Sequence, residues 1–539
     1  MFITSVSVQP CTSNFRKFIV SLFILVSLFS LFWIYFFFLN PLRPKNIIVM
    51  IGDGMGPQQI SLAMQYAKQA PGSAIQDATL NLERLMQEGE LGLMGTYIHQ
   101  NLVTDSAGSA TQLATGAWTR AEMVGLDHEG NRRETVLEKA KRHGKAVGFV
   151  TNTRMTHATP AGFYAHQRHR SLENEIALDL LELKPDVAFA GGLRHFLPKN
   201  LDMGNEKIPL MLVSKRKDDR NLIQEFRNAG YDILYSRQAL ETFSASHHAK
   251  VLGFFDVSNL PYVIDTRVYQ QDSNFPYPSL KEMSLKALEV LSKNKHGFVL
   301  MIEGGLIDYA GHYNDTGMML HELLAFDEAI GGVMDWISGR RDTLLIVTAD
   351  HETGGFGLSY SKNNVPPPKA LSGDAMKNAW YAPKFNFGNP EVLDRIFKQK
   401  KSFEKILEEF EALAKMEQKP QALQKLTNEN CEFKISLEDA QNILKTEPNT
   451  FFIKDHEYLG DPEMPKIHDF KEFYVYGFEN RCNLMGRAMA KEQQVVWGTG
   501  THTSTLVPIM SYGPSKISKK FSGYIHSTKV GQTLLDLID

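Results

Sequence analysis

The chain has 539 residues, a formal net charge of −3, 43% hydrophobic residues and 22% charged residues. This length suffices for a large core, as one large domain with insertions or as two domains. The near-neutral charge argues against nucleic-acid binding. Three cysteines cannot form a disulfide framework, because at most Cys431 and Cys482 could pair. Any metal ligands are therefore expected to be oxygen atoms and imidazoles.

The N-terminal segment predicts a transmembrane anchor. Residues 18–39 carry no charge and are rich in Phe, Leu, Ile and Val, and as a helix they span roughly 33 Å, enough to cross a bilayer. Arg16 and Lys17 precede them, which favours a cytoplasmic tail over residues 1–17. A cleaved signal peptide is the alternative. Both interpretations place the main domain, residues 46–539, outside the cytoplasm, in the periplasm or the extracellular space.

Strands and helices alternate through the rest of the chain. Strands are expected at 46–51, 146–150, 187–190, 298–302, 343–348 and 507–512, and helices at 134–142, 171–183, 280–291 and 529–537. Continuous apolar strands separated by helices predict an α/β fold, with a mainly parallel central sheet and helices on both faces. In such sheets, functional sites gather at the carboxyl ends of the strands.

Acids and histidines occur where these strands end. They are Asp53, Glu303, Asp308, His312, Asp350 and His351. If residues 303–312 are helical, Asp308 and His312 share one face, because they are four residues apart. Each of these residues could singly be a helix cap or a local hydrogen-bond partner. Together, however, so many acids repel one another unless cations neutralise them. Carboxylate with imidazole suits zinc, and carboxylate with hydroxyl suits magnesium.

The segment Val103 to Thr111 offers a candidate nucleophile. Its acid, hydroxyl and run of small residues predict the start of a helix near Ser106. A serine at a helix N-terminus lies in a positive field that favours an anion. Ordinary helix capping is the alternative interpretation of the same residues.

Six motifs together resemble those of the alkaline phosphatases. They are Gly52-Asp53-Gly54-Met55-Gly56, Thr104-Asp105-Ser106-Ala107, His157-Ala158-Thr159-Pro160-Ala161, Glu303 through His312, Thr348-Ala349-Asp350-His351, and Gly500-Thr501-His502-Thr503. The resemblance runs from about Asn46 to the C-terminus, apart from one large insertion. It implies hydrolysis of small phosphate monoesters at alkaline pH by a metal-dependent enzyme.

The resemblance also implies roles for individual residues. Ser106 would be the nucleophile and form a phosphoserine, and Arg170 would bind the phosphate, with Arg168 as the alternative arginine. The implied metals are two zinc ions and one magnesium ion. The implied ligands are Asp308, His312 and His502 for one zinc, Asp53, Asp350 and His351 for the other, and Asp53, Thr159 and Glu303 for magnesium.

Two further positions are expected to contact substrate, His157 beside the magnesium ligands and Tyr309 beside the first zinc. Family members differ at these positions, and some bacterial members have Asp and Lys there. Because Tyr309 is not a cation, we expect product phosphate to inhibit less strongly than in the Asp/Lys type.

The insertion between His351 and His502 is assigned to residues 357–490. Apolar residues from Phe403 to Leu413 repeat at helical spacing, and Ser436 and Asp439 have the spacing of a capping box. The segment is interpreted as a lid or crown over the site, with a possible homodimer contact. A surface subdomain without a functional role is the alternative.

Other functions remain open from the sequence. A phosphodiesterase or nucleotide pyrophosphatase of the same superfamily more often uses a threonine nucleophile. A sulfatase would need a Cys/Ser-x-Pro-x-Arg signature, which is absent at Ser106. A catalytically inactive, membrane-anchored binding homologue should have lost ligands, whereas every implied metal position is filled here.

Overall fold

A computed structural model describes residues 13–34, 43–200, 213–245, 250–267, 269, 272 and 275–538. Its described strands form a ten-stranded sheet in the order β16-β2-β15-β8-β1-β7-β3-β4-β6-β5. The strands are β1 (Asn46–Gly52), β2 (Glu90–Gly95), β3 (Ala146–Arg154), β4 (Val187–Gly191), β5 (Asp232–Leu234), β6 (Val251–Phe254), β7 (Phe298–Gly304), β8 (Thr343–Thr348), β15 (Val507–Tyr512) and β16 (Gly523–His526). The predicted α/β class is confirmed.

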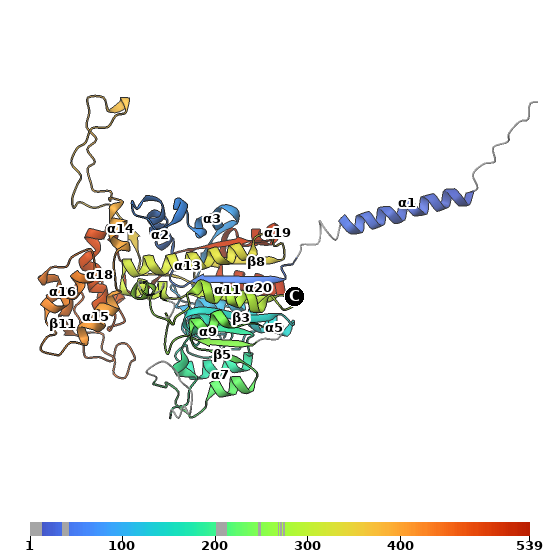
Figure 1. Cartoon of the computed structure of the whole chain (residues 1–539), viewed down its shortest axis with the longest axis horizontal. Coiled ribbons are helices and arrows are strands. Elements are labelled where there is room, and N and C mark those ends of the chain that lie inside the picture. Colours follow the sequence, from blue (N-terminus) through green and yellow to red (C-terminus); the bar gives the residue numbers. More distant parts are fainter. Residues whose placement is uncertain are drawn as a thin grey trace, which may run out of the picture.

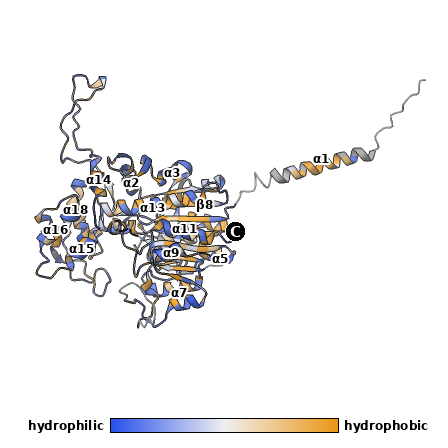
Figure 2. Ribbon diagram, viewed as in Figure 1, coloured by the Kyte–Doolittle hydropathy of each residue, from blue (hydrophilic) through white to orange (hydrophobic). Residues whose placement is uncertain are grey.

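The sheet is parallel except at one strand. β15 pairs antiparallel with both of its neighbours, β8 and β2, whereas the other pairs run parallel. The central strands β1, β7 and β8 are buried along their whole length, and Figure 2 shows the sheet largely in the hydrophobic colour. This burial explains their continuous apolar sequences, because helices cover both faces.

Two sets of helices flank the sheet (Figure 1). α11 (Leu280–Leu291) and α13 (Thr316–Ile337) pack together, and α4 (Ser106–Thr115), α5 (Val136–Arg142) and α20 (Ser527–Ile538) pack together as the second set. α5 starts later than residue 134 because Thr135 and Glu138 form a capping box that fixes its first turn. The remaining helices of this part are α2 (Pro57–Gln69), α3 (Asn81–Glu88), α6 (Ala158–Gly162), α7 (Glu173–Leu183), α8 (Leu222–Asn228), α9 (Arg237–Thr242), α10 (Val263–Thr266), α12 (Leu306–Tyr313) and α19 (Ser515–Ser518).

The segment assigned as an insertion forms a helical lobe at one end of the molecule (Figure 1). It contains α14 (Glu391–Phe397), α15 (Phe403–Glu411), α16 (Pro420–Asn430), α17 (Leu437–Leu444) and a hairpin of β11 (Thr446–Pro448) with β12 (Glu463–Pro465). α18 (Asn480–Gln493) runs across the assigned boundary at residue 490. The expected capping box at Ser436 is present, and Cys431 and Cys482 are both buried and free.

Short strands join the lobe to the catalytic part. β9 (Glu352–Thr353) pairs with β14 (His502–Thr503), and β10 (Gly357–Leu358) pairs with β13 (Val495–Val496). These pairs bring the segment after His351 alongside the segment that carries His502. Residues far apart in the chain therefore meet at the carboxyl ends of the central strands.

The N-terminal helix α1 extends from Ser13 to Ile34. Among the residues that the structure describes, no helix is both long enough and apolar enough to cross a membrane. α1 includes Arg16 and Lys17 and ends before residue 39, and residues 35–39 lie outside the described ranges. Part of the transmembrane anchor predicted over residues 18–39 therefore lies outside the described residues, and the anchor and the membrane-anchored, extracytoplasmic location stay predictions.

Candidate active site and metal centre

The candidate site lies at the carboxyl ends of four adjacent strands, β8, β1, β7 and β3. Asp53 follows β1 directly, and Glu303 lies within β7, opposite Ile51 in the ladder. Asp350 and His351 follow β8. All four of these side chains are fully buried. Parallel pairing thus brings the acids of separate strands to one edge, as the sequence predicted.

Gly54 allows these elements to approach one another closely. Its φ of +72° lies in the left-handed region, and a Cβ there would be 2.8 Å from the Cα of Asp308. Its N–H donates to Asp350 Oδ1 at 3.1 Å. A side chain at this position would therefore push α12 away from β1 and disturb the site.

Ser106 is the first residue of α4. Asp105 caps this helix by accepting from the backbone N–H groups of Ala107 and Gly108 at 3.2 and 3.1 Å, which explains why the helix starts here. The Ser106 hydroxyl lies 3.3 Å from His351 Nε2. Burial and the adjacent His502 ring hold the pKa of His351 well below its usual value, so the ring is neutral and one of its two nitrogens carries a lone pair.

Asp105 also positions Arg170. Arg170 Nη1 donates to Asp105 Oδ2 at 3.0 Å, and Arg170 Nη2 lies 3.4 Å from His157 Nε2. Burial would raise the pKa of Asp105, but the Arg170 guanidinium and two backbone N–H groups outweigh it and lower that pKa. Arg168, the alternative arginine, is exposed. The structure therefore brings Arg170 to the Ser106 segment.

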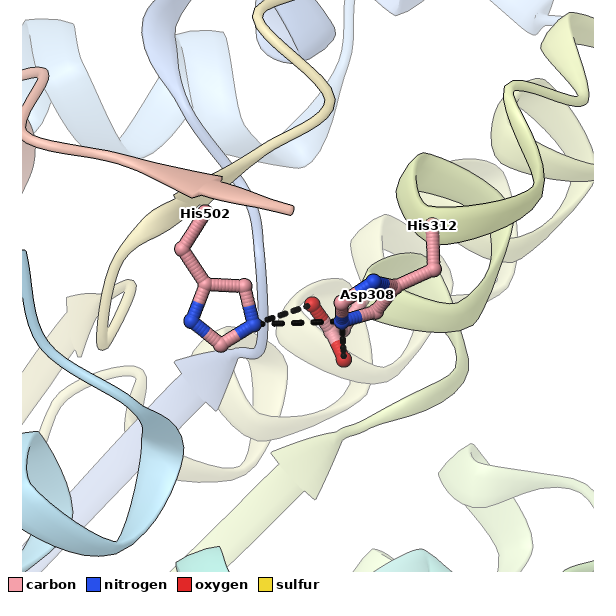
Figure 3. A group of neighbouring side chains, drawn as sticks. All are labelled: Asp308, His312 and His502. Carbon is pink, nitrogen blue, oxygen red and sulfur yellow. Dashed lines mark hydrogen bonds and ion pairs between the residues drawn. The ribbon is translucent and has the colours of Figure 1, made fainter. Parts of the chain in front are cut away.

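Asp308, His312 and His502 form the first candidate metal group, drawn in Figure 3. His312 Nε2 lies 3.3 Å from Asp308 Oδ2 and 3.1 Å from His502 Nε2. The other ring nitrogens are each engaged by a backbone carbonyl, Gly500 O at 2.8 Å and Thr104 O at 2.9 Å. This fixes both tautomers so that the Nε2 atoms converge, as they do in metal-binding histidines.

The charges of this first group suit a cation. Burial would lower the pKa of His312, but Asp308 and Glu479 outweigh it and raise that pKa to about 9. Burial lowers the pKa of His502 to about 4. The side chains of Asp308, His312 and His502 therefore share one proton among their convergent ligand atoms. A divalent cation bound there would replace that proton.

Asp53, Asp308 and His351 form the second group, and Asp350, the expected ligand in place of Asp308, lies beside it. His351 Nε2 lies 3.4 Å from Asp53 Oδ1 and 3.2 Å from Asp350 Oδ2. Neither carboxylate oxygen has a hydrogen-bond partner among the described residues. Burial and the neighbouring carboxylates raise the pKa of Asp53 well above its usual value and that of Asp350 to about 8. Buried carboxylate atoms without partners indicate a bound cation.

Glu303 is the centre of a third group. Its Oε2 accepts from the hydroxyls of Thr151 and Thr153. β3 continues past residue 150 because Thr151 pairs with Glu303 of β7 and Arg154 pairs with Gly191 of β4. Its Oε1 has no hydrogen-bond partner among the described residues and lies 3.7 Å from His157 Nδ1. The described Asp53, His157 and Glu303 could jointly hold a cation.

Thr159 and Tyr309 complete the expected site residues. The Thr159 hydroxyl donates to Asp53 Oδ2 at 3.0 Å, so it lies beside the third group. The Tyr309 hydroxyl accepts from the partly buried Arg154, which also donates to Glu173 at 2.9 Å. The Tyr309 ring lies 6.3 Å from that of His157.

Several residues around the metal groups were missed in the sequence. Thr353 donates to Asp308 Oδ1 at 2.5 Å and lies 3.2 Å from His351 Nδ1, so it links two groups. From the helical lobe, Tyr476 packs edge-on to His312 with ring centroids 5.2 Å apart. Glu479 Oε2 lies 3.7 Å from His312 Nδ1. Of these residues, only Thr353 could have been found from the sequence, because it lies two residues after His351.

Comparisons with known proteins all match this chain to alkaline phosphatases, along nearly its whole length. The sequence model of the family described as "Alkaline phosphatase" matches residues 44–538. Alkaline phosphatase 3 of Bacillus subtilis is 30% identical over 91% of this chain and 88% of its own length. The repressible alkaline phosphatase of Saccharomyces cerevisiae is also 30% identical, over 92% and 82%. The solved alkaline phosphatase of Thermus thermophilus superposes with a TM-score of 0.70 at 27% identity, covering 91% of this chain and 90% of that one.

Proposed function

This chain belongs to the alkaline phosphatase family of phosphoric monoester hydrolases, and we propose that it forms a phosphoserine on Ser106 during the hydrolysis of small phosphate monoesters. The observation that carries the proposal is the Ser106 hydroxyl at a helix start, 3.3 Å from His351 Nε2 and beside the buried acid and histidine groups. Members of this family depend on metals, and the three candidate metal groups described above could hold such ions in this chain.

We assign zinc to the two groups that combine imidazole and carboxylate. Asp308, His312 and His502 would hold one zinc, and Asp53, Asp350 and His351 the other. Asp53, Thr159 and Glu303 would hold magnesium, which prefers oxygen ligands, with His157 next to them. When bound, the metals supply Lewis acidity that favours the ionised serine and stabilises the leaving oxygen.

The chain's own residues perform the remaining steps. The Ser106 oxygen attacks phosphorus and the alcohol leaves, so that the phosphoryl group is transferred to Ser106; a water molecule then releases phosphate and restores the serine. Arg170 can hold two phosphoryl oxygens at once through its planar fork. Its bond to Asp105 Oδ2 uses Nη1 and fixes the direction of the guanidinium.

The test is hydrolysis of p-nitrophenyl phosphate by the full chain across pH, before and after chelation. We expect turnover that rises above neutrality, is lost with the chelator and returns when zinc and magnesium are both added. Bis-p-nitrophenyl phosphate tests the phosphodiesterase alternative in parallel. Faster turnover of the diester, or no turnover with metals bound, would contradict the proposal.

A further inference from the structure

A cavity of about 540 Å³ lies within the helical lobe. Its walls come from α15, the β11–β12 hairpin and the segment leading into α18, elements that Figure 1 shows together at one end of the molecule. Neither the metal groups nor Ser106 lines this cavity. Its volume suits a small organic group and exceeds what one metal ion needs.

The cavity adjoins the first metal group through tyrosines. Tyr313 lines the cavity and directly follows His312 in α12. Tyr458, on another wall, packs edge-on to Tyr476 with ring centroids 5.0 Å apart, and Tyr476 packs in the same way on His312 at 5.2 Å. The cavity wall at Tyr458 is therefore separated from His312 of the first metal group by one aromatic ring, that of Tyr476.

Acidic side chains dominate the charge of the cavity. The lining acids are Glu404, Glu408, Glu411, Glu457, Asp461, Glu463 and Glu472, against Lys471 and Arg481 as lining bases. Both bases already face acids, since Arg481 Nη1 lies 3.2 Å from Glu411 and Lys471 Nζ lies 3.7 Å from Glu447. The cavity therefore carries an excess of negative charge, which disfavours anionic groups.

Glu404 is the lining acid that links the cavity to the site. Its carboxylate accepts from the Tyr313 hydroxyl at 2.8 Å and is partly buried. Aromatic rings, including Phe451, Tyr458 and Phe478, supply other parts of the walls, together with apolar side chains such as Leu407 and Met464. Aromatic faces and carboxylates together attract organic cations, because both offer negative potential to a weakly hydrated positive charge.

We propose that this cavity binds a positively charged group on the alcohol part of the substrate. The preferred substrates are then phosphate monoesters of alcohols that carry a primary or quaternary ammonium group. The inference rests on the proposed phosphomonoesterase activity, because that activity places the phosphoryl group beside Arg170. A second metal ion or a nucleotide fits less well, given the cavity's size and its negative charge.

The test uses two inhibitors that differ only in charge. These are 3-(trimethylammonio)propylphosphonate and 4,4-dimethylpentylphosphonate, in which a quaternary nitrogen replaces a quaternary carbon and no alcohol can leave. Their competitive inhibition constants are measured against p-nitrophenyl phosphate with the metal-loaded full chain. We expect the cationic phosphonate to bind about tenfold more tightly at low ionic strength. Equal binding of the two inhibitors, or tighter binding of the phosphonate with the uncharged tail, overturns the inference.

Two variants test whether the Glu404 carboxylate causes the preference for the cationic phosphonate. Glu404→Gln keeps an acceptor for the Tyr313 hydroxyl but removes the charge, and we expect it to lower the preference for the cationic phosphonate about threefold or more. Glu438→Gln makes the same change at an exposed position that does not line the cavity, and should leave the preference unchanged. An equal effect of both variants, or no effect of Glu404→Gln, overturns the inference. Absence of p-nitrophenyl phosphate turnover in the parent chain would instead contradict the proposed function.

Discussion

Replacing Thr353 by valine removes one hydroxyl that serves two metal groups. Thr353 is fully buried, donates to Asp308 Oδ1 at 2.5 Å and lies 3.2 Å from His351 Nδ1. Valine has nearly the same shape, so the change leaves Asp308 with one hydrogen bond fewer. A hydrogen bond to a charged group contributes about 1.5–3 kcal/mol, which corresponds to a loss of roughly 10- to 150-fold in zinc affinity if the ligand orientation depends on it.

The assay is zinc competition with a chromophoric chelator, with bound metal counted after equilibration. Thr427→Val is the matched control, because Thr427 is also fully buried but its hydroxyl has no hydrogen-bond partner among the described residues. We expect zinc affinity to fall at least tenfold in Thr353→Val and to stay within twofold in Thr427→Val. Unchanged zinc affinity in Thr353→Val would refute the idea that its hydroxyl orients Asp308 and His351.

Three further changes have defined outcomes. Arg170→Ala should raise KM for p-nitrophenyl phosphate about 30-fold, because charge-assisted hydrogen bonds to the phosphate are lost. Arg168→Ala changes an exposed side chain and should change KM less than twofold. Equal effects of the two variants would contradict the assignment of Arg170 as the phosphate-binding arginine. Tyr309→Lys should strengthen phosphate inhibition about fivefold, for an ion pair worth roughly 1 kcal/mol, and an unchanged inhibition constant would count against it. Burial raises the pKa of Glu322 to about 8, so the folded state holds a proton that the unfolded state releases, and this contribution to stability is lost as pH rises toward 8. Glu322→Gln should therefore reduce the fall in the free energy of unfolding between pH 5 and 8 by on the order of 3 kcal/mol, measured by denaturant unfolding at each pH. An unaltered pH dependence would contradict the burial of the Glu322 carboxyl as its cause.

The central sheet could be predicted from sequence because its strands are buried on both faces. Such strands read as continuous apolar runs, and β8 and α11 have the predicted bounds, Thr343–Thr348 and Leu280–Leu291. Their order in the sheet and the antiparallel direction of β15 could not be predicted, because both depend on pairing between distant segments. Local periodicity carries no information on such pairing.

The acids at the strand ends were predictable for a related reason. Parallel strands place their carboxyl ends at one edge of the sheet, so Asp53, Glu303 and Asp350 were expected at that edge. They meet because β8, β1 and β7 are neighbours in the sheet. The choice of Arg170 over Arg168 depended on the local path of the chain, where the Arg170 N–H donates to the Glu122 carbonyl at 2.8 Å. From the sequence, only the resemblance to the alkaline phosphatases favoured Arg170, and residue periodicity did not distinguish the two arginines.

The helical lobe shows where sequence information ends. Its helices follow apolar spacing and caps, but the approach of Tyr476 and Glu479 to His312 depends on how α18 packs against α12. The cavity beside the first metal group arises from that same packing. Neither feature leaves a local signal, since the residues that meet come from separate elements of the chain.

The most direct test of the account is to trap the phosphoryl group on Ser106. The metal-loaded full chain is mixed with a phosphate monoester at low pH, quenched with acid, digested and analysed by mass spectrometry, with Ser106→Ala in parallel. The account predicts one phosphorylated peptide, modified at Ser106, and a Ser106→Ala variant that retains its metals but loses the phosphopeptide and nearly all turnover. A Ser106→Ala variant with normal turnover, or phosphate on another residue, would contradict it.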